Sequence, residues 1–351
     1  MTAPRPGPGA TAAELGATRV GVVVPAYREG ALIERVLRGI PPWVEAVFVV
    51  DDASPDDTAE RAEAVGDPRV KVLRHDHNQG VGAAMQTGFE AALQAGLDIV
   101  VKMDGDDQMD PRYLPDLLAP LLAGEADVVK GNRYTHLDAL AQMPLVRIVG
   151  NAGLTFLVKA ASGYWQSFDP SNGYLAVRTP VLERLDLSRL PRRFFFESGF
   201  LIELGIQRAV VQSVPIPARY GAERSSLSIR HTLVSFPPRL FWGLVRRLFW
   251  RYFVHDFSAV SLFLLVGLPS CLFGLVFGSI LWWRLHDTAY ASAGMVMLAA
   301  MPIILGVQML LQAVVLDIQN VPARPISPPL PRPAARAEER EPAFLSARDS
   351  L

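Results

Sequence analysis

The sequence LDIVVKMDGDDQMD, residues 97–110, joins an apolar run directly to a cluster of acids. The β-branched residues Ile99, Val100 and Val101 indicate a buried strand, and Gly105 marks the turn that ends it. Ligands of open α/β sheets bind at the carboxyl ends of the strands. We therefore expect the acids to lie at the mouth of a catalytic cleft.

The acids also have the spacing of a metal site. Asp104 and Asp106 lie two residues apart, so their carboxylates can converge on one cation, and the Gln108 amide adds a third oxygen donor. Such ligands suit Mg²⁺ or Mn²⁺ holding a diphosphate. The alternative is that these acids only cap the next helix. Capping explains Asp110, which precedes Pro111, and leaves the other acids unexplained.

Strands and helices alternate on both sides of this segment. Upstream, we expect strands at residues 19–24, 46–50 and 70–73 and helices at residues 32–37 and 83–95. Downstream, we expect a helix at 113–122, a strand at 127–130 and a helix at 145–161. This alternation predicts an α/β domain with a mainly parallel sheet at residues 19–230. Residues 1–18 are rich in Pro, Gly and Ala and are expected to be a flexible leader.

The composition narrows the class of protein. The 351 residues carry a formal net charge of -1 and contain no zinc spacing or recognition motif, so no binding to nucleic acid is expected. The only cysteine, Cys271, lies in an apolar run, which argues against disulfides and thiol catalysis. Hydrophobic residues make up 50% of the chain, and their excess near the C-terminus indicates membrane attachment.

The C-terminal third has the pattern of a membrane anchor. Residues 231–257 interleave aromatic side chains with arginines, which is typical of an interfacial amphipathic helix on an anionic leaflet; a solvated basic helix is the alternative. Residues 258–318 contain two runs, each long enough to cross the ~30 Å hydrocarbon core, and are interpreted as a transmembrane hairpin. Arginines flank both outer ends, so the positive-inside rule puts both ends in the cytoplasm. Residues 319–351 are expected to be a disordered tail.

Four ordered motifs support a family assignment: VPAYRE at residues 24–29, DDAS at 51–54, NQGVGA at 78–83 and DGDDQ at 104–108. With them, the chain resembles the family 2 glycosyltransferases, and among these the polyprenyl-phosphate (dolichyl-phosphate mannosyltransferase-like) group of the bacterial membrane-anchored type. The resemblance covers about residues 20–226. It implies a GT-A fold (Rossmann-like), a nucleotide-sugar donor and a divalent cation, Mg²⁺ or Mn²⁺.

The resemblance also implies roles for single residues. The implied donor-site residues are Pro25, Tyr27 and Glu29 in the nucleoside pocket, Asp52 at the base, Lys102 beside the acids, Asp104, Asp106 and Gln108 at the metal and diphosphate, and Arg133, Arg147, Arg219 and Arg224 near phosphates. For any single arginine, a surface role is the alternative. The chain departs from many dolichyl-phosphate relatives at Leu175, where they carry a basic residue.

The acceptor determines the remaining chemistry. With the cation and Asp106 stabilising the leaving diphosphate, the acceptor oxygen attacks the anomeric carbon from the opposite face and inverts it. A lipid phosphate is already ionised at neutral pH. A sugar hydroxyl of a growing polysaccharide or lipid-linked oligosaccharide instead needs a carboxylate to take its proton. The candidates for that base are Asp169 and Glu197, and a structural cap or turn role is the alternative for each.

Two rival functions are weaker. A processive polysaccharide synthase would carry a Gln-x-x-Arg-Trp motif, which the sequence lacks. A non-catalytic nucleotide-sugar-binding scaffold would not need to keep Asp104, Asp106 and Gln108 together. We therefore expect a multi-pass enzyme of the cell inner membrane that takes a UDP- or GDP-sugar and polyprenyl phosphate or another lipid-linked acceptor for cell-envelope glycan synthesis. Homo-oligomer formation stays open.

Overall fold

The fold is described from a computed structural model, which covers residues 10–133, 145–167, 169–170, 172–217, 229–285 and 290–330. The described chain forms two compact units. The first unit runs to Gly243 and takes up the chain again from Pro322. The second unit is Leu244–Val321.

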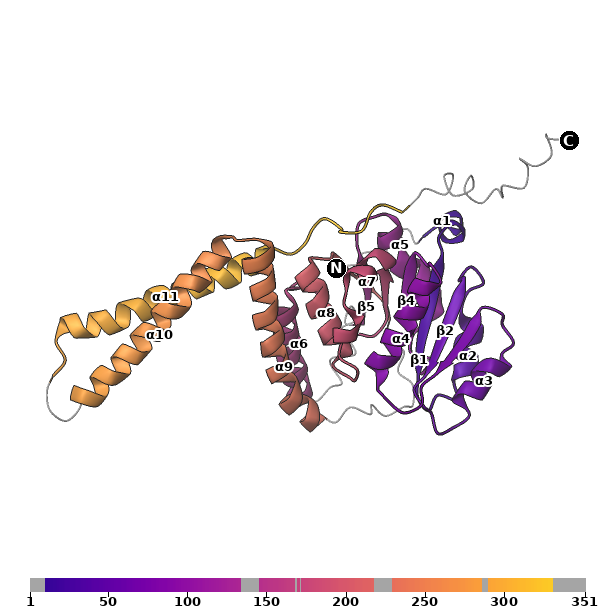
Figure 1. The fold of residues 1–351 in the computed structure, drawn as a ribbon, viewed down its shortest axis with the longest axis horizontal. Helices are drawn as coiled ribbons and strands as arrows, with labels where there is room; N and C mark the ends of the chain where they lie inside the picture. Colours follow the sequence, from indigo (N-terminus) through magenta and orange to yellow (C-terminus); the bar gives the residue numbers. More distant parts are fainter. Residues whose placement is uncertain are drawn as a thin grey trace, which may run out of the picture. The chain divides into compact units, whose positions relative to one another are not determined.

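The described part of the first unit is built on a seven-stranded mixed sheet (Figure 1). Its strands are β1 (Val20–Ala26), β2 (Ala46–Asp51), β3 (Val70–Arg74), β4 (Ile99–Lys102), β5 (Val128–Asn132), β6 (Leu175–Arg178) and β7 (Val211–Pro215). They lie in the order β3-β2-β1-β4-β6-β5-β7. All pairs are parallel except the two that β6 makes with β4 and β5. The predicted mainly parallel α/β sheet is therefore confirmed.

Helices follow most of these strands. They are α1 (Ala12–Ala17), α2 (Ile33–Gly39), α3 (Thr58–Ala64), α4 (Val81–Gln94), α5 (Leu114–Leu122), α6 (Leu145–Ser162), α7 (Thr179–Arg184), α8 (Phe196–Gln207) and α9 (Ile229–Phe249), which continues into the second unit. Short 3₁₀ turns lie at Pro111–Tyr113 and Leu187–Arg189.

The central strands are buried on both faces. Val22, Val23 and Val24 of β1 are all fully buried, as are the apolar residues of β4. Continuous apolar runs of this kind suit a parallel sheet covered by helices on both sides. In α4, Gly88 faces Val23 so closely that an added Cβ would collide with it, which brings this helix onto the sheet.

The start of the chain differs from the expected flexible leader. Thr11 and Glu14 form a capping box, so Ala12–Ala17 is a short helix. Leu15 of this helix is buried in the main core. The leader prediction is therefore wrong for this stretch, whereas residues 1–9 lie outside the described chain.

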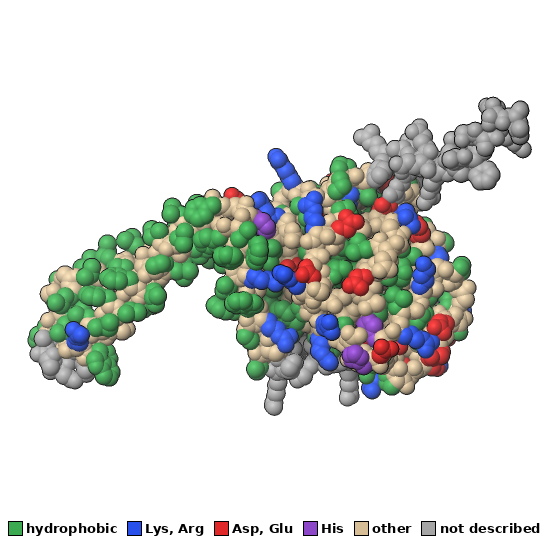
Figure 2. Space-filling model, viewed as in Figure 1, with side chains coloured by type: hydrophobic (Ala, Val, Ile, Leu, Met, Phe, Trp, Pro, Cys, Tyr) green, Lys and Arg blue, Asp and Glu red, His purple; other side chains and the backbone are tan. Residues whose placement is uncertain are grey.

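The second unit contains the two predicted spans. The helices α10 (Ala259–Leu285) and α11 (Ala293–Gln319) are the two described helices that are long and apolar enough to cross a membrane. They pack against each other as a hairpin, and hydrophobic side chains are spread along their visible surface (Figure 2). Their length and composition support membrane anchoring of the chain.

The segment that leads into the hairpin contains a buried ion pair, and its placement at a membrane interface stays a prediction. The α9 helix passes into a π-helical turn at Trp250–His255. Arg247 is fully buried, and its guanidinium donates to both carboxylate oxygens of Asp317 at 2.8 Å. The Tyr252 hydroxyl donates to the same carboxylate at 2.6 Å. Arg247 therefore holds the end of α11 rather than lipid headgroups.

The chain after the hairpin also differs from expectation. Within the predicted disordered tail, Pro322 to Leu330 rejoin the first unit, where Ile326 and Ser327 donate backbone hydrogen bonds to Asp127. The disorder prediction is wrong for this stretch. Residues 331–351 lie outside the described chain.

Candidate active site

A cavity of about 660 Å³ lies where the parallel strands end. The carboxyl ends of β1, β2, β4, β5 and β7 all reach this edge of the sheet, and α4, α6, α8 and α9 also contribute lining residues. The predicted site residues among its lining are Pro25, Tyr27, Glu29, Asp52, Lys102, Asp104, Asp106, Gln108, Arg133 and Glu197. The cavity has the size of a small-molecule or cofactor site.

Three loops at this edge hold strained backbone. Arg28 (φ 64°), Ala53 (φ 56°) and Asp107 (φ 59°) are three of the four described non-glycine residues with positive φ. They follow β1, β2 and β4. Each left-handed residue of this kind costs about 1–3 kcal/mol and persists only when its surroundings fix it. Two of these loops, those after β1 and β2, brace each other, since the Arg28 N–H donates to Ser54 Oγ at 3.1 Å.

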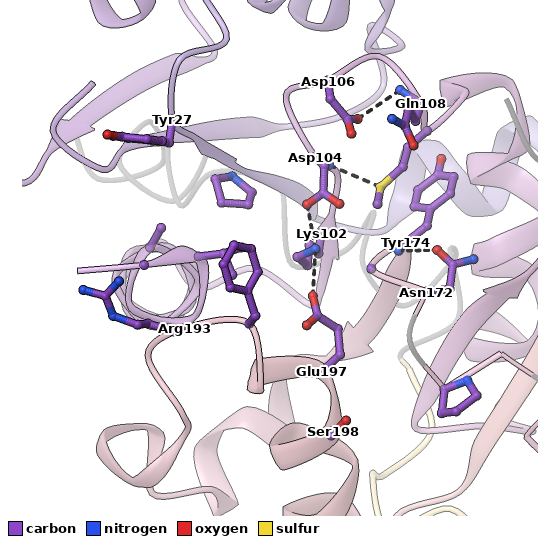
Figure 3. Close-up of a pocket in the computed structure, with 18 of the residues that line it drawn as sticks. Tyr27, Lys102, Asp104, Asp106, Gln108, Asn172, Tyr174, Arg193, Glu197 and Ser198 are labelled. Carbon is purple, nitrogen blue, oxygen red and sulfur yellow. Dashed lines mark hydrogen bonds and ion pairs between the residues drawn. The ribbon is translucent and has the colours of Figure 1, made fainter. Parts of the chain in front are cut away.

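A buried lysine joins two walls of the cavity. Lys102 Nζ lies 2.6 Å from Asp104 Oδ1 and 3.3 Å from Glu197 Oε1, and its side chain is 1% exposed (Figure 3). Burial alone would lower the pKa of Lys102, but the neighbouring carboxylates of Asp104 and Glu197 outweigh it and raise the pKa above its ordinary value. The ammonium therefore stays charged and neutralises both acids.

Close packing explains the glycine beside this lysine. An added Cβ at Gly173 would lie 2.9 Å from Asp104 Oδ2 and would also meet Lys102 Nζ. Only a residue without a side chain lets the backbone pass so near the two charged groups. Gly173 thus closes the cavity against Asp104.

The acids after β4 divide into three roles. Asp104 and Asp106 line the cavity with Gln108, whose N–H donates to Asp106 Oδ1 at 3.1 Å. Asp107 instead pairs with Arg35 Nε at 2.9 Å and is not among the described lining residues. Asp110 accepts the Arg112 N–H at 3.0 Å and caps the following turn, as the capping alternative predicted.

The donor atoms on this wall fit a hard divalent cation. The protein offers two carboxylates, Asp104 and Asp106, and one amide oxygen, Gln108, on one side of a cavity large enough for a nucleotide. The described residues contain no cluster of three or more acidic, His or Cys ligands. A Mg²⁺ or Mn²⁺ held here would take its other oxygen ligands from water and a diphosphate, which is the usual arrangement for Mg²⁺.

The expected base-contacting acid is already engaged. Asp52 accepts the N–H groups of Gln79 at 2.9 Å and Gly80 at 2.7 Å, and His75 Nδ1 lies 2.8 Å from its Oδ1. Asp52 is 2% exposed but still contributes to the cavity lining. Its carboxylate holds the loop before α4 in place, and its contact with a base stays a prediction.

The glycines of the NQGVGA motif have a packing role that the sequence did not reveal. An added Cβ at Gly82 would collide with the carbonyl oxygen of Pro191, and one at Gly80 would lie 2.6 Å from that of Arg192. The Ala83 N–H donates to the Arg192 carbonyl at 2.9 Å. The motif is therefore the docking point of the loop that carries Arg193 and leads into α8, where Glu197 lies.

Arg133 and Asp169 form a second ion pair beside the cavity. Arg133 Nε donates to Asp169 Oδ2 at 2.8 Å and Nη2 donates to Oδ1 at 3.1 Å. Asp169 is 2% exposed and is not among the described residues that line the cavity. Of the two predicted base candidates, only Glu197 faces the cavity. Asp169 orients Arg133.

Lys130 is a buried charge that sequence reasoning missed. Its ammonium donates to the carbonyls of Asn172 at 2.8 Å and Pro170 at 3.2 Å. Burial lowers the pKa of Lys130 to about 8, although the charges of Glu197 and Asp169 act in the opposite direction. The lysine fixes the loop before β6. A lysine inside the apolar run of β5 was the available signal.

The remaining wall is apolar. Leu154 and Val158 of α6, Phe194 before α8 and Phe236 of α9 also line the cavity. Phe236 packs edge-on against Phe195 at 5.1 Å between ring centroids. The cavity thus combines a charged side with an aliphatic and aromatic side.

Three predicted arginines are not placed. Arg219 and Arg224 lie outside the described residues. Arg147 belongs to α6, but its side chain also lies outside the described part of the chain.

Known proteins resemble this chain in sequence. A family model described as glycosyl transferase family 2 matches residues 21–186. The undecaprenyl-phosphate mannosyltransferase of Micrococcus luteus is 31% identical over 195 residues, which cover 54% of this chain and 78% of that protein. The UDP-N-acetylglucosamine–dolichyl-phosphate N-acetylglucosaminyltransferase of Methanococcus voltae is 26% identical over 239 residues, which cover 64% and 94% of the two chains.

Solved structures resemble it in fold. Glucosyl-3-phosphoglycerate synthase from Mycobacterium tuberculosis, in complex with Mn²⁺, UDP and glucosyl-3-phosphoglycerate, superimposes with a TM-score of 0.53 at 25% identity. The match covers 70% of this chain and 86% of that one. The same synthase has also been crystallised with Mg²⁺ and UDP.

Proposed function

This chain belongs to glycosyl transferase family 2, and from that premise we propose that it transfers a sugar from a nucleotide-sugar donor to polyprenyl phosphate. The relatives named above act on undecaprenyl phosphate and dolichyl phosphate. The proposal rests most directly on one observation, the cavity that combines an acidic, oxygen-rich wall with an apolar wall and Arg133.

The acidic wall suits the donor. Asp104, Asp106 and Gln108 would hold a Mg²⁺ or Mn²⁺, which when bound neutralises the charge that develops on the leaving diphosphate. Tyr27 is 40% exposed at the cavity and offers a ring face to the nucleoside. The similar synthase that binds UDP with Mn²⁺ or Mg²⁺ supports both donor class and cation.

The apolar part of the lining suits a lipid phosphate. Leu154, Val158 and Phe236 offer apolar contact to an isoprenoid chain, while Arg133 offers a guanidinium to its phosphate. A phosphate oxygen is ionised at neutral pH, so it attacks the anomeric carbon without a general base. It enters from the face opposite the diphosphate, the bond to the diphosphate breaks with its electron pair, and the configuration inverts.

Transfer to a sugar hydroxyl is the second candidate. Glu197 favours it, because this carboxylate lines the cavity, where it pairs with the Lys102 ammonium. A base in that position could accept the hydroxyl proton.

The membrane setting follows from the hairpin. We propose that α10 and α11 anchor the enzyme in the cell inner membrane with the catalytic unit and both termini in the cytoplasm. Roles of Arg147, Arg219 and Arg224 at phosphates, and the formation of homo-oligomers, stay predictions.

One screen tests the proposal. Membranes containing the full chain are incubated with UDP- and GDP-sugars, with and without added polyprenyl phosphate, and lipid products are identified by mass spectrometry. We expect one donor to give a glycosylated polyprenyl phosphate that requires the added lipid. Transfer to saccharide alone would support the hydroxyl acceptor instead.

A further inference from the structure

Asp127 is a fully buried carboxylate that lies outside the cavity and binds two separate segments of the chain. Its Oδ2 accepts the N–H groups of Val210 at 2.8 Å and Ile326 at 2.9 Å. Its Oδ1 accepts the N–H of Ser327 at 2.9 Å. Val210 precedes β7, whereas Ile326 and Ser327 come after the membrane hairpin. A buried carboxylate needs such donors, since without them its charge is poorly solvated.

The segment that reaches Asp127 is suited to docking in extended form. Its sequence from residue 322 to 330 is PARPISPPL, with four prolines in nine residues. Prolines favour an extended backbone before docking and so reduce the conformational entropy lost. They also remove N–H groups, and the adjacent pair Ile326 and Ser327 supplies the two donors that this segment offers to Asp127.

Two further contacts fix the same segment. Arg178, which is 1% exposed, donates from Nη2 to the Pro328 carbonyl. Leu330 packs against the main hydrophobic core. One short stretch of chain, which Figure 1 shows in yellow after α11, is thus bound by a buried arginine and a buried carboxylate and also packs on the core.

The docking surface lies at the edge of the sheet opposite the cavity. Asp127 and Val210 immediately precede β5 and β7, whose carboxyl ends lead to the cavity. Arg178 ends β6, which runs antiparallel to β5, so it reaches the same edge as Asp127. The segment is therefore not a lid over the catalytic site.

We propose that Asp127, Val210 and Arg178 form a binding surface for an extended peptide, and that its partner is the chain's own segment from Pro322 to Leu330, which clamps the catalytic unit after the hairpin. The clamp makes the hairpin an insertion with both ends fixed in one folded unit, because that unit includes the chain up to Gly243 and again from Pro322. The chain between these points must then cross a membrane an even number of times, and α10 with α11 provides two crossings.

Hydrogen exchange of the full chain in detergent tests the clamp. We expect the Ile326 and Ser327 amides to exchange about tenfold more slowly, or slower still, than those of Ala323 and Arg324, since only the first pair donates to a buried acceptor. Asp127→Asn, which keeps the side-chain shape but loses one acceptor oxygen, should reduce this protection. Equal exchange of the two pairs in the unaltered protein would overturn the proposal.

Matched proline variants provide a second readout. Ile326→Pro removes one donor to Asp127 without altering the docking surface, while Ala323→Pro changes an exposed residue of the same segment. We expect Ile326→Pro to lower the Tm by about 3–10 °C relative to Ala323→Pro, with the transfer rate unchanged below the transition. Equal melting of the two variants, or loss of transfer by Ile326→Pro without a change in Tm, would contradict a clamp.

Discussion

Lys102 Nζ lies 3.3 Å from Glu197 Oε1, so a residue at the end of a central strand contacts a helix that begins more than ninety positions later in the chain. The same ammonium contacts Asp104 at 2.6 Å. This single buried charge links the Asp104 wall, which is expected to bind the donor, to Glu197. Of the two predicted base candidates, Glu197 is the one that lines the cavity in the described part of the chain.

Lys102→Met should therefore destabilise the protein and impair transfer. Removing one partner of a buried ion pair leaves an uncompensated charge, and we expect a loss of about 3 kcal/mol in the free energy of unfolding. Chemical denaturation in detergent and the transfer rate measure the two effects. Lys71→Met, at an exposed lysine, is the control. Equal stability of both variants would show that the Lys102 ammonium is not needed by the two acids.

Lys130 should make stability depend on pH in the alkaline range. Its pKa is about 8 in the folded chain and near the ordinary lysine value when unfolded, so the unfolded state binds more protons between these values. Its unfavourable contribution is complete below pH 8 and disappears as the pH rises towards ~10.4. We expect stability relative to Lys130→Met to increase by up to about 1.4 kcal/mol per pH unit in this window. If the difference in free energy of unfolding between the native chain and Lys130→Met stayed constant from pH 8 to 10, the lowered pKa of Lys130 would be refuted.

Asp106→Ala should remove cation-dependent transfer, and Asp104→Ala should reduce it less. Both variants lose a carboxylate from the cavity wall. Asp107→Ala is the matched control, because Asp107 belongs to the same motif but pairs with Arg35. Rates are measured against Mg²⁺ and Mn²⁺ concentration. Full turnover of Asp106→Ala in EDTA, or equal loss in Asp107→Ala, would contradict the proposed cation site.

Gly82→Ala should change the shape of the cavity by moving the loop at Pro191. Its new methyl group would collide with the Pro191 carbonyl and displace the loop that carries Arg193 and leads to Glu197 of α8. We expect a loss of transfer with a lowered Tm. In Gly153→Ala the added methyl meets no neighbour and sits at an exposed position of α6, so the same change there should be neutral or stabilising by about 0.5–1 kcal/mol. Normal transfer by Gly82→Ala would show that the loop tolerates a shift.

The sequence predicted the elements whose signal is local. Strands β1, β2 and β4 are continuous apolar runs, and each was expected within about two residues of its observed ends. The acids after β4 and the cavity-lining motifs also follow from the chain order, because parallel strands bring their carboxyl ends to one edge.

Features that depend on distant partners were not predicted. The four residues of β6 carry no marker of an antiparallel strand between β4 and β5. Lys130 is explained only by carbonyls forty positions away, and Arg247 only by Asp317, which is seventy positions away. The arginines of residues 231–257 therefore suggested lipid contact, although Arg247 forms a buried ion pair.

The acceptor is the central claim, and one measurement tests it most directly. The full chain is given its donor with either polyprenyl phosphate or the same polyprenol without phosphate, and kcat is measured for the native chain, Glu197→Gln and Asp106→Ala, with product masses determined. We expect polyprenyl phosphate, and not polyprenol, to give a product one glycosyl unit heavier. We also expect a smaller loss in kcat for Glu197→Gln than for Asp106→Ala. The contrary result is a product from polyprenol and none from polyprenyl phosphate, with Glu197→Gln slowing that transfer by ~10²–10⁴-fold, which is the usual cost of removing a general base. That result would contradict the account.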